Sequence, residues 1–309
     1  MRYVVTGGAG FIGSTLVRHL LRSGHEVVVL DDFSAGKESN LAGVAGPLTV
    51  VRGSIVDAGL VADVFSKADG VFHLAAVASV QRSMEEPLFC HAVNVTGTVN
   101  VLAAARSLGV PRVVLSSSAA VYGEADDFPL VETVSAHPIS PYGMHKLMNE
   151  VCARLYADLG WVETVCLRYF NVFGPRQDPN GDYAAVVPKF ITAVLAGESP
   201  TIFGDGEQSR DFMFVEDVAA ANLAAMTTSG VSGRVFNVCA GIETDLLQLL
   251  AGIQAGAGTS LSPVFARTRA GDIRRSVGSD RAIREALSLP AWRTVADGLA
   301  AAVKAYQRS

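Results

Sequence analysis

The sequence has few of the residues that would indicate a metal centre, a disulfide framework or a nucleic-acid surface. Its four cysteines, Cys90, Cys152, Cys166 and Cys239, lie far apart and form no CxxC pair, so neither a zinc site nor disulfides are indicated. They are typical of small buried side chains in a reducing compartment, which favours a cytoplasmic protein. The 25 Lys and Arg residues form no basic run and are outnumbered by 30 Asp and Glu, so nucleic acid is not an expected partner.

Long apolar runs are also missing. No stretch approaches the roughly 18 uninterrupted apolar residues of a membrane span, and Tyr3–Thr6 is too short for the core of a signal peptide. Aromatic residues make up only 7% of the chain although apolar residues make up 50%. Ala, Val, Leu and Gly carry the apolar share, which is typical of buried parallel strands and closely packed helices. The sequence therefore predicts an α/β protein with no membrane span and no metal site.

Apolar segments of strand length alternate with longer helical patterns. The expected strands are Tyr3–Thr6, Val27–Leu30, Thr49–Val51, Gly70–His73, Arg112–Ser116 and Thr164–Arg168. This alternation is typical of βαβ units and predicts a doubly wound parallel sheet of the Rossmann type. After Asn171, Gly, Pro, Asp and Asn cluster, and later helices such as Val215–Met226 alternate with short strands such as Arg234–Val238. We expect a dinucleotide-binding domain in residues 1–170 and, in residues 171–309, a smaller C-terminal substrate-binding lobe interleaved with the last strands.

A glycine-rich loop follows the first expected strand. The segment TGGAGFIG at Thr6–Gly13 contains G-x-G-x-x-G, and a helical pattern opens at Phe11. Glycines let backbone amides approach a pyrophosphate, and a helix N-terminus adds free N–H groups and partial positive charge. Asp31, at the end of the second strand, can accept hydrogen bonds from ribose hydroxyls and would repel a 2′-phosphate. The loop therefore favours NAD over NADP, although Lys37 lies close enough to leave the choice open.

Tyr142 and Lys146 form a Y-x-x-x-K pair on one face at the start of a helix. The ammonium and a nicotinamide cation would lower the tyrosine pKa from about 10, giving a base near neutrality. Ser116–Ser118 end a strand where a hydroxyl donor to a sugar oxygen is expected, and Ser118 is the candidate; the alternative is that these serines satisfy loop backbone. His145 is expected to point away, as a surface or packing residue.

With these motifs together, the chain resembles the extended short-chain dehydrogenases/reductases, and within them the UDP-hexose 4-epimerases, along nearly its full length. The matching motifs occur in the family's order: TGGAGFIG (Thr6–Gly13), DDFSAG (Asp31–Gly36), HLAA (His73–Ala76), Asn94, SSSAAVYG (Ser116–Gly123), SPYGMHK (Ser140–Lys146) and RYFNVFGPRQDP (Arg168–Pro179). The resemblance implies NAD-dependent inversion of C4 of a UDP-linked hexose, UDP-glucose or UDP-N-acetylglucosamine. It also implies that Tyr142 is the base and acid at O4, Lys146 its partner and ribose anchor, and Ser118 the second hydrogen-bond partner of O4.

The resemblance also assigns the binding residues. For NAD these are Gly7, Gly10, Phe11, Ile12, Gly13, Asp31, Asp32, Ser34, Gly36, Ser54, Ile55, Leu74, Ala75, Ala76, Asn94, Tyr142, Lys146 and Tyr169, the last beside the nicotinamide. For the UDP-sugar they are Ser79, Ser118, Tyr142, Asn171, Val187, Lys189, Arg210, Arg269, Asp272 and Ser276. Asn171, Arg210, Arg269 and Asp272 are implied to hold the diphosphate and the uridine ribose.

Some positions depend on the resemblance or depart from it. Without it, Arg210 beside Asp211 would be interpreted as a surface charge pair. Ser276 replaces a bulky residue of enzymes restricted to plain hexoses, which leaves room for an N-acetyl group. Ser54 and Ser279 stand where relatives commonly have aspartate, and the first change suggests looser adenine binding.

Other functions are weighed against the same residues. A 4,6-dehydratase or a UDP-glucuronate decarboxylase is disfavoured because Ala119 and Ala120 replace the Asp-Glu of those relatives. A UDP-glucuronate 4-epimerase remains an alternative. A non-catalytic NAD-binding sensor is disfavoured because Tyr142, Lys146 and the serine are all present. The resemblance further implies a homodimer formed through helices within Pro87–Leu108 and Tyr142–Leu159.

Overall fold

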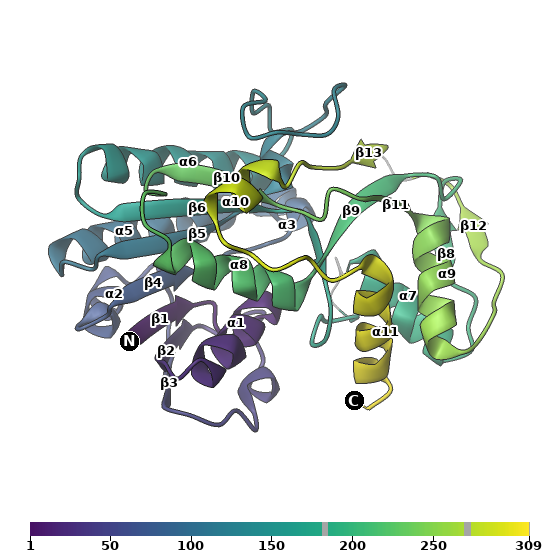
Figure 1. The fold of residues 1–309 in the computed structure, drawn as a ribbon, viewed down its shortest axis with the longest axis horizontal. Coiled ribbons are helices and arrows are strands. Elements are labelled where there is room, and N and C mark those ends of the chain that lie inside the picture. Colours follow the sequence, from purple (N-terminus) through teal and green to yellow (C-terminus); the bar gives the residue numbers. More distant parts are fainter. Residues whose placement is uncertain (181–184, 269–272, 309) are drawn as a thin grey trace.

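The computed structural model describes residues 1–180, 185–268 and 273–308. Its largest sheet has seven parallel strands (Figure 1). The strands lie in the order β10-β6-β5-β4-β1-β2-β3. Their bounds are β1 (Arg2–Thr6), β2 (Glu26–Asp31), β3 (Leu48–Arg52), β4 (Gly70–His73), β5 (Arg112–Ser118), β6 (Glu163–Tyr169) and β10 (Arg234–Val238). Each expected strand is present within one or two residues of its expected ends, so the predicted Rossmann-type sheet is confirmed.

Helices cover both faces of this sheet, which explains why its strands are apolar on both sides. The helices α1 (Phe11–Arg22) and α8 (Val215–Thr227) pack on one face with Val5, and α2 (Ala58–Phe65), α5 (Gly97–Ser107) and α6 (Pro141–Asp158) pack on the other with Val4. Neighbouring valines point to opposite faces because side chains alternate along a strand. The sheet and its two helical layers hold the ends of β1, β2, β4 and β5 at one edge, where the loops of interest begin.

A second group of strands lies at the other end of the molecule (Figure 1). It contains β9 (Ser209–Phe214) paired with β7 (Asn171–Phe173), β11 (Glu243–Asp245) and β13 (Arg275–Ser276), and a separate pair of β8 (Thr201–Phe203) with β12 (Val264–Ala266). The helices α7 (Val186–Leu195), α9 (Leu246–Ala257) and α11 (Val295–Tyr306) share a core with β9. Because α8 and β10 return to the main sheet, the two groups are interleaved along the chain; the division at residue 170 stays a prediction.

The remaining helices are short, and several of them join the main layers. They are η1 (Glu38–Leu41), α3 (Val80–Glu85), α4 (Pro87–His91), the π-helix η2 (Ala92–Thr96), η3 (Ala119–Val121) and α10 (Arg281–Ala286). The elements α4, η2 and α5 follow one another without a break, so Pro87–Ser107 forms one long helical stretch.

This long stretch is apolar enough, by length and composition, to cross a membrane, which the sequence analysis did not expect. However, 44% of its most apolar window is buried inside the protein, and α5 packs against α2 and α6. A core helix of a globular domain meets the same criterion, so the stretch is weak evidence for a membrane span.

Candidate functional site

The loop between β1 and α1 has the backbone form that a phosphate cradle requires. Gly7 has φ +71°, and a Cβ there would lie 2.7 Å from the amide nitrogen of Ala75. A Cβ on Gly13 would lie 2.1 Å from the carbonyl oxygen of Gly7. Gly10 caps α1 without a side-chain hydrogen bond, so no side chain covers the first N–H groups of the helix at its cap. These N–H groups and the close-packed glycines fit a pyrophosphate, as expected for Phe11 and Ile12 at the start of α1.

Asp31 is held in place beside this loop. Its carboxylate accepts hydrogen bonds from the N–H groups of Ala9 and Phe33, each at 2.8 Å, and it is almost fully buried. Burial raises the pKa of Asp31, and the two backbone hydrogen bonds work against that rise. Asp32 accepts hydrogen bonds from the backbone N–H and the hydroxyl of Ser34. The loop that is expected to bind the adenosine ribose is therefore fixed by its own carboxylates.

Other expected NAD contacts serve the fold as well. The side chain of Asn94 accepts from Val77 N at 2.7 Å and donates to Val77 O at 3.1 Å, so it holds the loop that carries Leu74, Ala75 and Ala76. Ile55 is buried in the core, and Ser54 accepts a bond from a neighbouring backbone N–H. Asn94 thus positions this loop, and whether it also touches NAD stays a prediction.

The structure brings Ser118, Tyr142 and Lys146 together at the carboxyl end of the sheet. Ser140 caps α6 by accepting from Gly143 N at 3.1 Å, which sets the first helical turn on which Tyr142 lies. The side chains of Tyr142 and Ser118 lie within interaction distance, and Ser118 is the side-chain hydrogen-bond partner that lowers the pKa of the Tyr142 phenol. The Lys146 Nζ donates to the carbonyl and the hydroxyl of Ser116, at 2.8 and 3.1 Å, and lies 5.9 Å from the centre of the Tyr142 ring.

The protonation states of this group are set mainly by burial. Burial raises the pKa of Tyr142, and the hydrogen bond with Ser118 partly offsets that effect. Burial also lowers the pKa of Lys146 to about 8. The side chains alone therefore do not produce the lowered tyrosine pKa that the sequence predicted. A bound oxidised nicotinamide ring would supply a further positive charge beside Tyr142 that acts in the lowering direction.

The three serines at the end of β5 have different partners. Ser116 is bonded to Lys146, and Ser117 donates to Glu150. Ser118 accepts from Ala120 N at 3.1 Å, so it satisfies loop backbone, and it also lies beside Tyr142, where its predicted catalytic role would place it. Tyr169 lies opposite Ser118 on the neighbouring strand, and its hydroxyl donates to Asn222 in α8 at 3.0 Å.

His145 was expected to be either a surface residue or a packing residue, and the structure shows that it is a packing residue. It is buried, its ring lies edge-on against His91 with centroids 5.3 Å apart, and burial lowers its pKa.

Three residues assigned to the sugar nucleotide meet around β9. Arg210 on β9 pairs in register with Ser276 on β13, while Asn171 on β7 donates to the carbonyl oxygen of Asp211 at 3.2 Å. The interpretation of Arg210 and Asp211 as a surface charge pair is wrong. Asp211 is completely buried and accepts hydrogen bonds from three backbone N–H groups, and burial raises its pKa to about 6.

Other assigned residues do not join this group so directly. Val187 is a residue of α7 and is buried in the core, whereas Lys189, on the same helix, is exposed. Ser79 caps α3 by accepting from Arg82 N at 3.0 Å. Arg269 and Asp272 lie outside the described residues.

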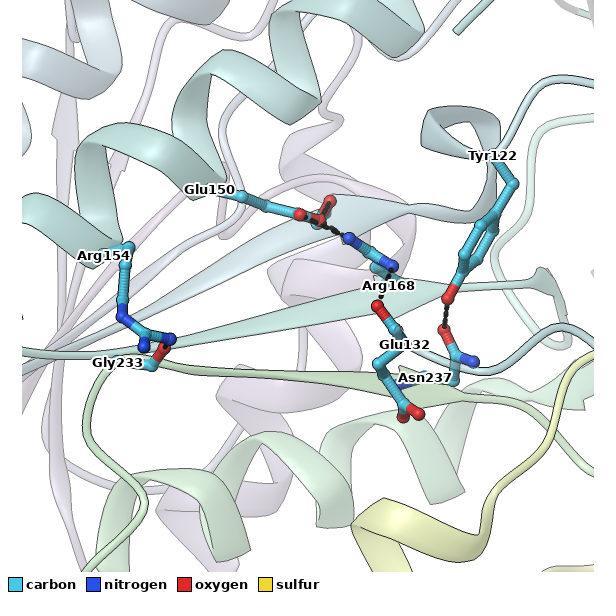
Figure 2. A network of polar contacts seen from close by, with 8 residues as sticks. Tyr122, Glu132, Glu150, Arg154, Arg168, Gly233 and Asn237 are labelled. Carbon is cyan, nitrogen blue, oxygen red and sulfur yellow. Dashed lines mark hydrogen bonds and ion pairs between the residues drawn. The ribbon is translucent and has the colours of Figure 1, made fainter. Parts of the chain in front are cut away.

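A buried polar network around Arg168 and Glu150 was not anticipated from the sequence (Figure 2). Arg168 on β6 donates twice to Glu150 on α6, at 2.9 and 2.8 Å, and its guanidinium lies 4.7 Å from the ring centre of Tyr122. Tyr122 in turn donates to Asn237 on β10 at 2.7 Å. Since Glu150 follows Lys146 by one helical turn, this network fixes α6 against the sheet. The i, i+4 spacing of Lys146 and Glu150 could have placed Glu150 on the same face of α6 as Lys146, but it does not identify Arg168 as the partner of Glu150.

Comparison with known proteins gives consistent matches. A model described as "NAD dependent epimerase/dehydratase family" matches residues 3–239. The chain is 42% identical to a UDP-glucose 4-epimerase of Mycolicibacterium smegmatis, over 99% of both chains. It superposes with a TM-score of 0.95 on a UDP-N-acetylglucosamine 4-epimerase from Methanobrevibacter ruminantium M1, at 37% identity, covering 99% of this chain and 98% of that one. A UDP-glucose 4-epimerase of Thermus thermophilus in complex with NAD gives a TM-score of 0.90 at 34% identity, with 99% of both chains covered.

These matches confirm NAD as the predicted cofactor and support the resemblance drawn from the motifs. Sugar-nucleotide decarboxylases and dehydratases are also among the matches. The reaction therefore has to be argued from the residues of the site.

Proposed function

Since the chain belongs to the NAD dependent epimerase/dehydratase family, we propose that it inverts C4 of a UDP-linked hexose. The observation that carries the proposal is the contact of Tyr142 with Ser118 and the nearby ammonium of Lys146, set where the phosphate loop and Asp31 fit NAD. When bound, NAD accepts a hydride from the sugar carbon and returns it.

Each side chain of the group has a separate task in this reaction. Tyr142 takes the proton of O4 as C4 is oxidised and returns a proton to O4 when C4 is reduced on its opposite face. Ser118 donates a hydrogen bond to the same oxygen and limits its movement. Lys146 is held by Ser116, with its Nζ 5.9 Å from the centre of the Tyr142 ring, and it would anchor the ribose of the cofactor. Arg210 and Asn171 hold the diphosphate, so that the hexose can turn while the nucleotide stays fixed.

The reactions of related dehydratases and decarboxylases fit the site less well. Elimination of water needs a second acid and base beside the tyrosine. The residues next to Ser118 are Ala119 and Ala120, in the short helix η3, and methyl groups cannot transfer protons. Epimerisation needs neither group.

The direct test is to incubate purified protein with UDP-glucose, and separately with UDP-N-acetylglucosamine, without added reductant. We expect the matching galacto-epimer in each reaction, resolved by chromatography. UDP-glucuronate is tested as a third substrate, and epimerisation of UDP-glucuronate alone would make the chain a uronate epimerase. If the protein binds NAD but converts none of the three UDP-sugars, it is a non-catalytic NAD-binding protein.

We propose that Ser276 admits the N-acetyl group. Its side chain is small and only half-buried, and it lies beside Arg210. Ser276→Tyr is expected to lower kcat/KM for UDP-N-acetylglucosamine about tenfold to hundredfold, because the larger side chain fills that space. UDP-glucose should change by less than about threefold. Ser276→Ala is the matched control and should leave both sugars unchanged; equal losses for both sugars with Ser276→Tyr would contradict the assignment.

We propose that two copies of the chain pair through α6 and the Pro87–Ser107 stretch. The apolar side chains of Leu88, Val151 and Leu155 are 85%, 63% and 53% exposed, and Val151 and Leu155 share one face of α6. Burying such a face against its copy removes apolar surface from water.

The double variant Val151→Glu/Leu155→Glu is therefore expected to run as a monomer in light scattering coupled to size-exclusion chromatography, where the unchanged protein runs as a dimer. Leu247→Glu, at an exposed position of α9, is the matched control and should remain dimeric. A monomeric unchanged protein, or a dimeric double variant, would overturn the assignment.

A further inference from the structure

Two basic residues, Lys37 and Arg52, lie on the segments that flank Asp31, the carboxylate expected to bind the adenosine ribose. Lys37 follows Gly36, where a Cβ would lie 2.9 Å from Oδ1 of Asp31, and its backbone N–H donates to Ala9 O at 3.1 Å. Arg52 is the register partner of Asp31 on the neighbouring strand. A cation at this place is what a site for a 2′-phosphate requires. By position alone, this edge of the sheet has the cations of an NADP site.

Both cations are held by carboxylates instead. The Lys37 Nζ lies 2.6 Å from Oδ2 of Asp178, and the Arg52 Nη2 lies 2.7 Å from Oε1 of Glu38. The guanidinium of Arg52 also lies 4.2 Å from the ring centre of Phe33. Asp178 comes from the loop after β7, far along the chain from Lys37, so this pairing exists only in the folded protein. The hydrogen bond from Lys37 keeps the pKa of Asp178 below its usual range, and Asp178 is ionised at neutral pH.

We infer that Asp178 and Glu38 are specificity-determining residues that make this site prefer NAD. They engage the two cations that would otherwise bind a 2′-phosphate. Each pair is solvent-exposed, so each contributes a modest factor that falls as salt rises. The preference of Asp31 is thus supported by charges that lie elsewhere in the sequence.

Binding of the two cofactors to protein freed of nucleotide tests this inference. The dissociation constants of NADP and NAD are measured by calorimetric titration at low ionic strength for Asp178→Asn, Glu38→Gln and the double variant. Each single variant should bind NADP about threefold to tenfold more tightly, and the double variant more tightly still, with NAD affinity unchanged within about twofold. Raising the salt concentration should reduce the gain.

Two controls separate this mechanism from a general change of charge. Lys37→Met/Asp178→Asn should lose the gain of Asp178→Asn, because the released cation is gone. Glu285→Gln removes another solvent-exposed carboxylate, paired with Arg281 on α10, and should change neither affinity. Unchanged NADP affinity in both single variants, or a gain that persists without Lys37, would overturn the inference. Because the readout is binding, failure of the proposed epimerase activity would not affect this outcome.

Discussion

Replacement of Tyr142 by Phe is expected to lower kcat for C4 inversion by about 10²–10⁴-fold, the usual contribution of a positioned general base. Phenylalanine keeps the partly buried ring and loses only the hydroxyl that interacts with Ser118. NAD affinity should change by less than about threefold, because the phosphate loop and Asp31 are untouched. The measurements are kcat at saturating UDP-glucose and a separate titration with NAD.

Tyr156→Phe is the matched control for this change. Tyr156 lies on the same helix, where its ring packs edge-on against Trp161 with centroids 5.1 Å apart, away from Ser118. Its variant should keep the unchanged kcat. If Tyr142→Phe retained a tenth or more of the activity, another group would have to move the O4 proton.

Replacement of Arg168 by Leu is expected to lower the free energy of unfolding by about 3–5 kcal/mol, because Glu150 would stay buried without its counter-ion. The two side chains are each only 6% exposed, so water cannot compensate for the lost pair. The free energy of unfolding is measured by urea titration followed by circular dichroism.

The double variant Glu150→Leu/Arg168→Leu completes the cycle and should lose less stability than Arg168→Leu alone, since no isolated charge remains. Arg281→Leu breaks an exposed pair with Glu285 and should cost less than about 1 kcal/mol. A loss for Arg168→Leu as small as that of Arg281→Leu would show that the buried pair is not a stabilising contact.

The sheet was predictable because its signals are local. Strands such as Gly70–His73 are short apolar runs bounded by loops, and each is identified without knowing its neighbours. The core of the site was predictable for the same reason: Tyr142 and Lys146 lie one turn apart, and the glycines of Thr6–Gly13 follow one strand directly. Ser118 was likewise a candidate from its place at the end of a strand, and the family's motifs added its expected role at O4.

The rest depends on contacts between distant segments. Nothing local couples Arg168 to Glu150, or Lys37 to Asp178, because each partner by itself has the sequence pattern of a solvated charge. The raised pKa of Tyr142 follows from burial, which the spacing of Tyr142 and Lys146 does not reveal. The burial of Asp211 beneath three backbone donors is also a contact between distant segments, which the adjacent residues Arg210 and Asp211 do not reveal.

The central claim is that the hydrogen at C4 leaves the sugar and returns to the same carbon. Incubation of the protein and NAD with UDP-glucose carrying deuterium at C4, followed by NMR of the nucleotide sugars, tests it directly. Our account predicts UDP-galactose that retains deuterium at C4, with no net reduction of NAD and no product from Tyr142→Phe. UDP-galactose with solvent hydrogen at C4, or no UDP-galactose while UDP-glucose is consumed to another product, would contradict it.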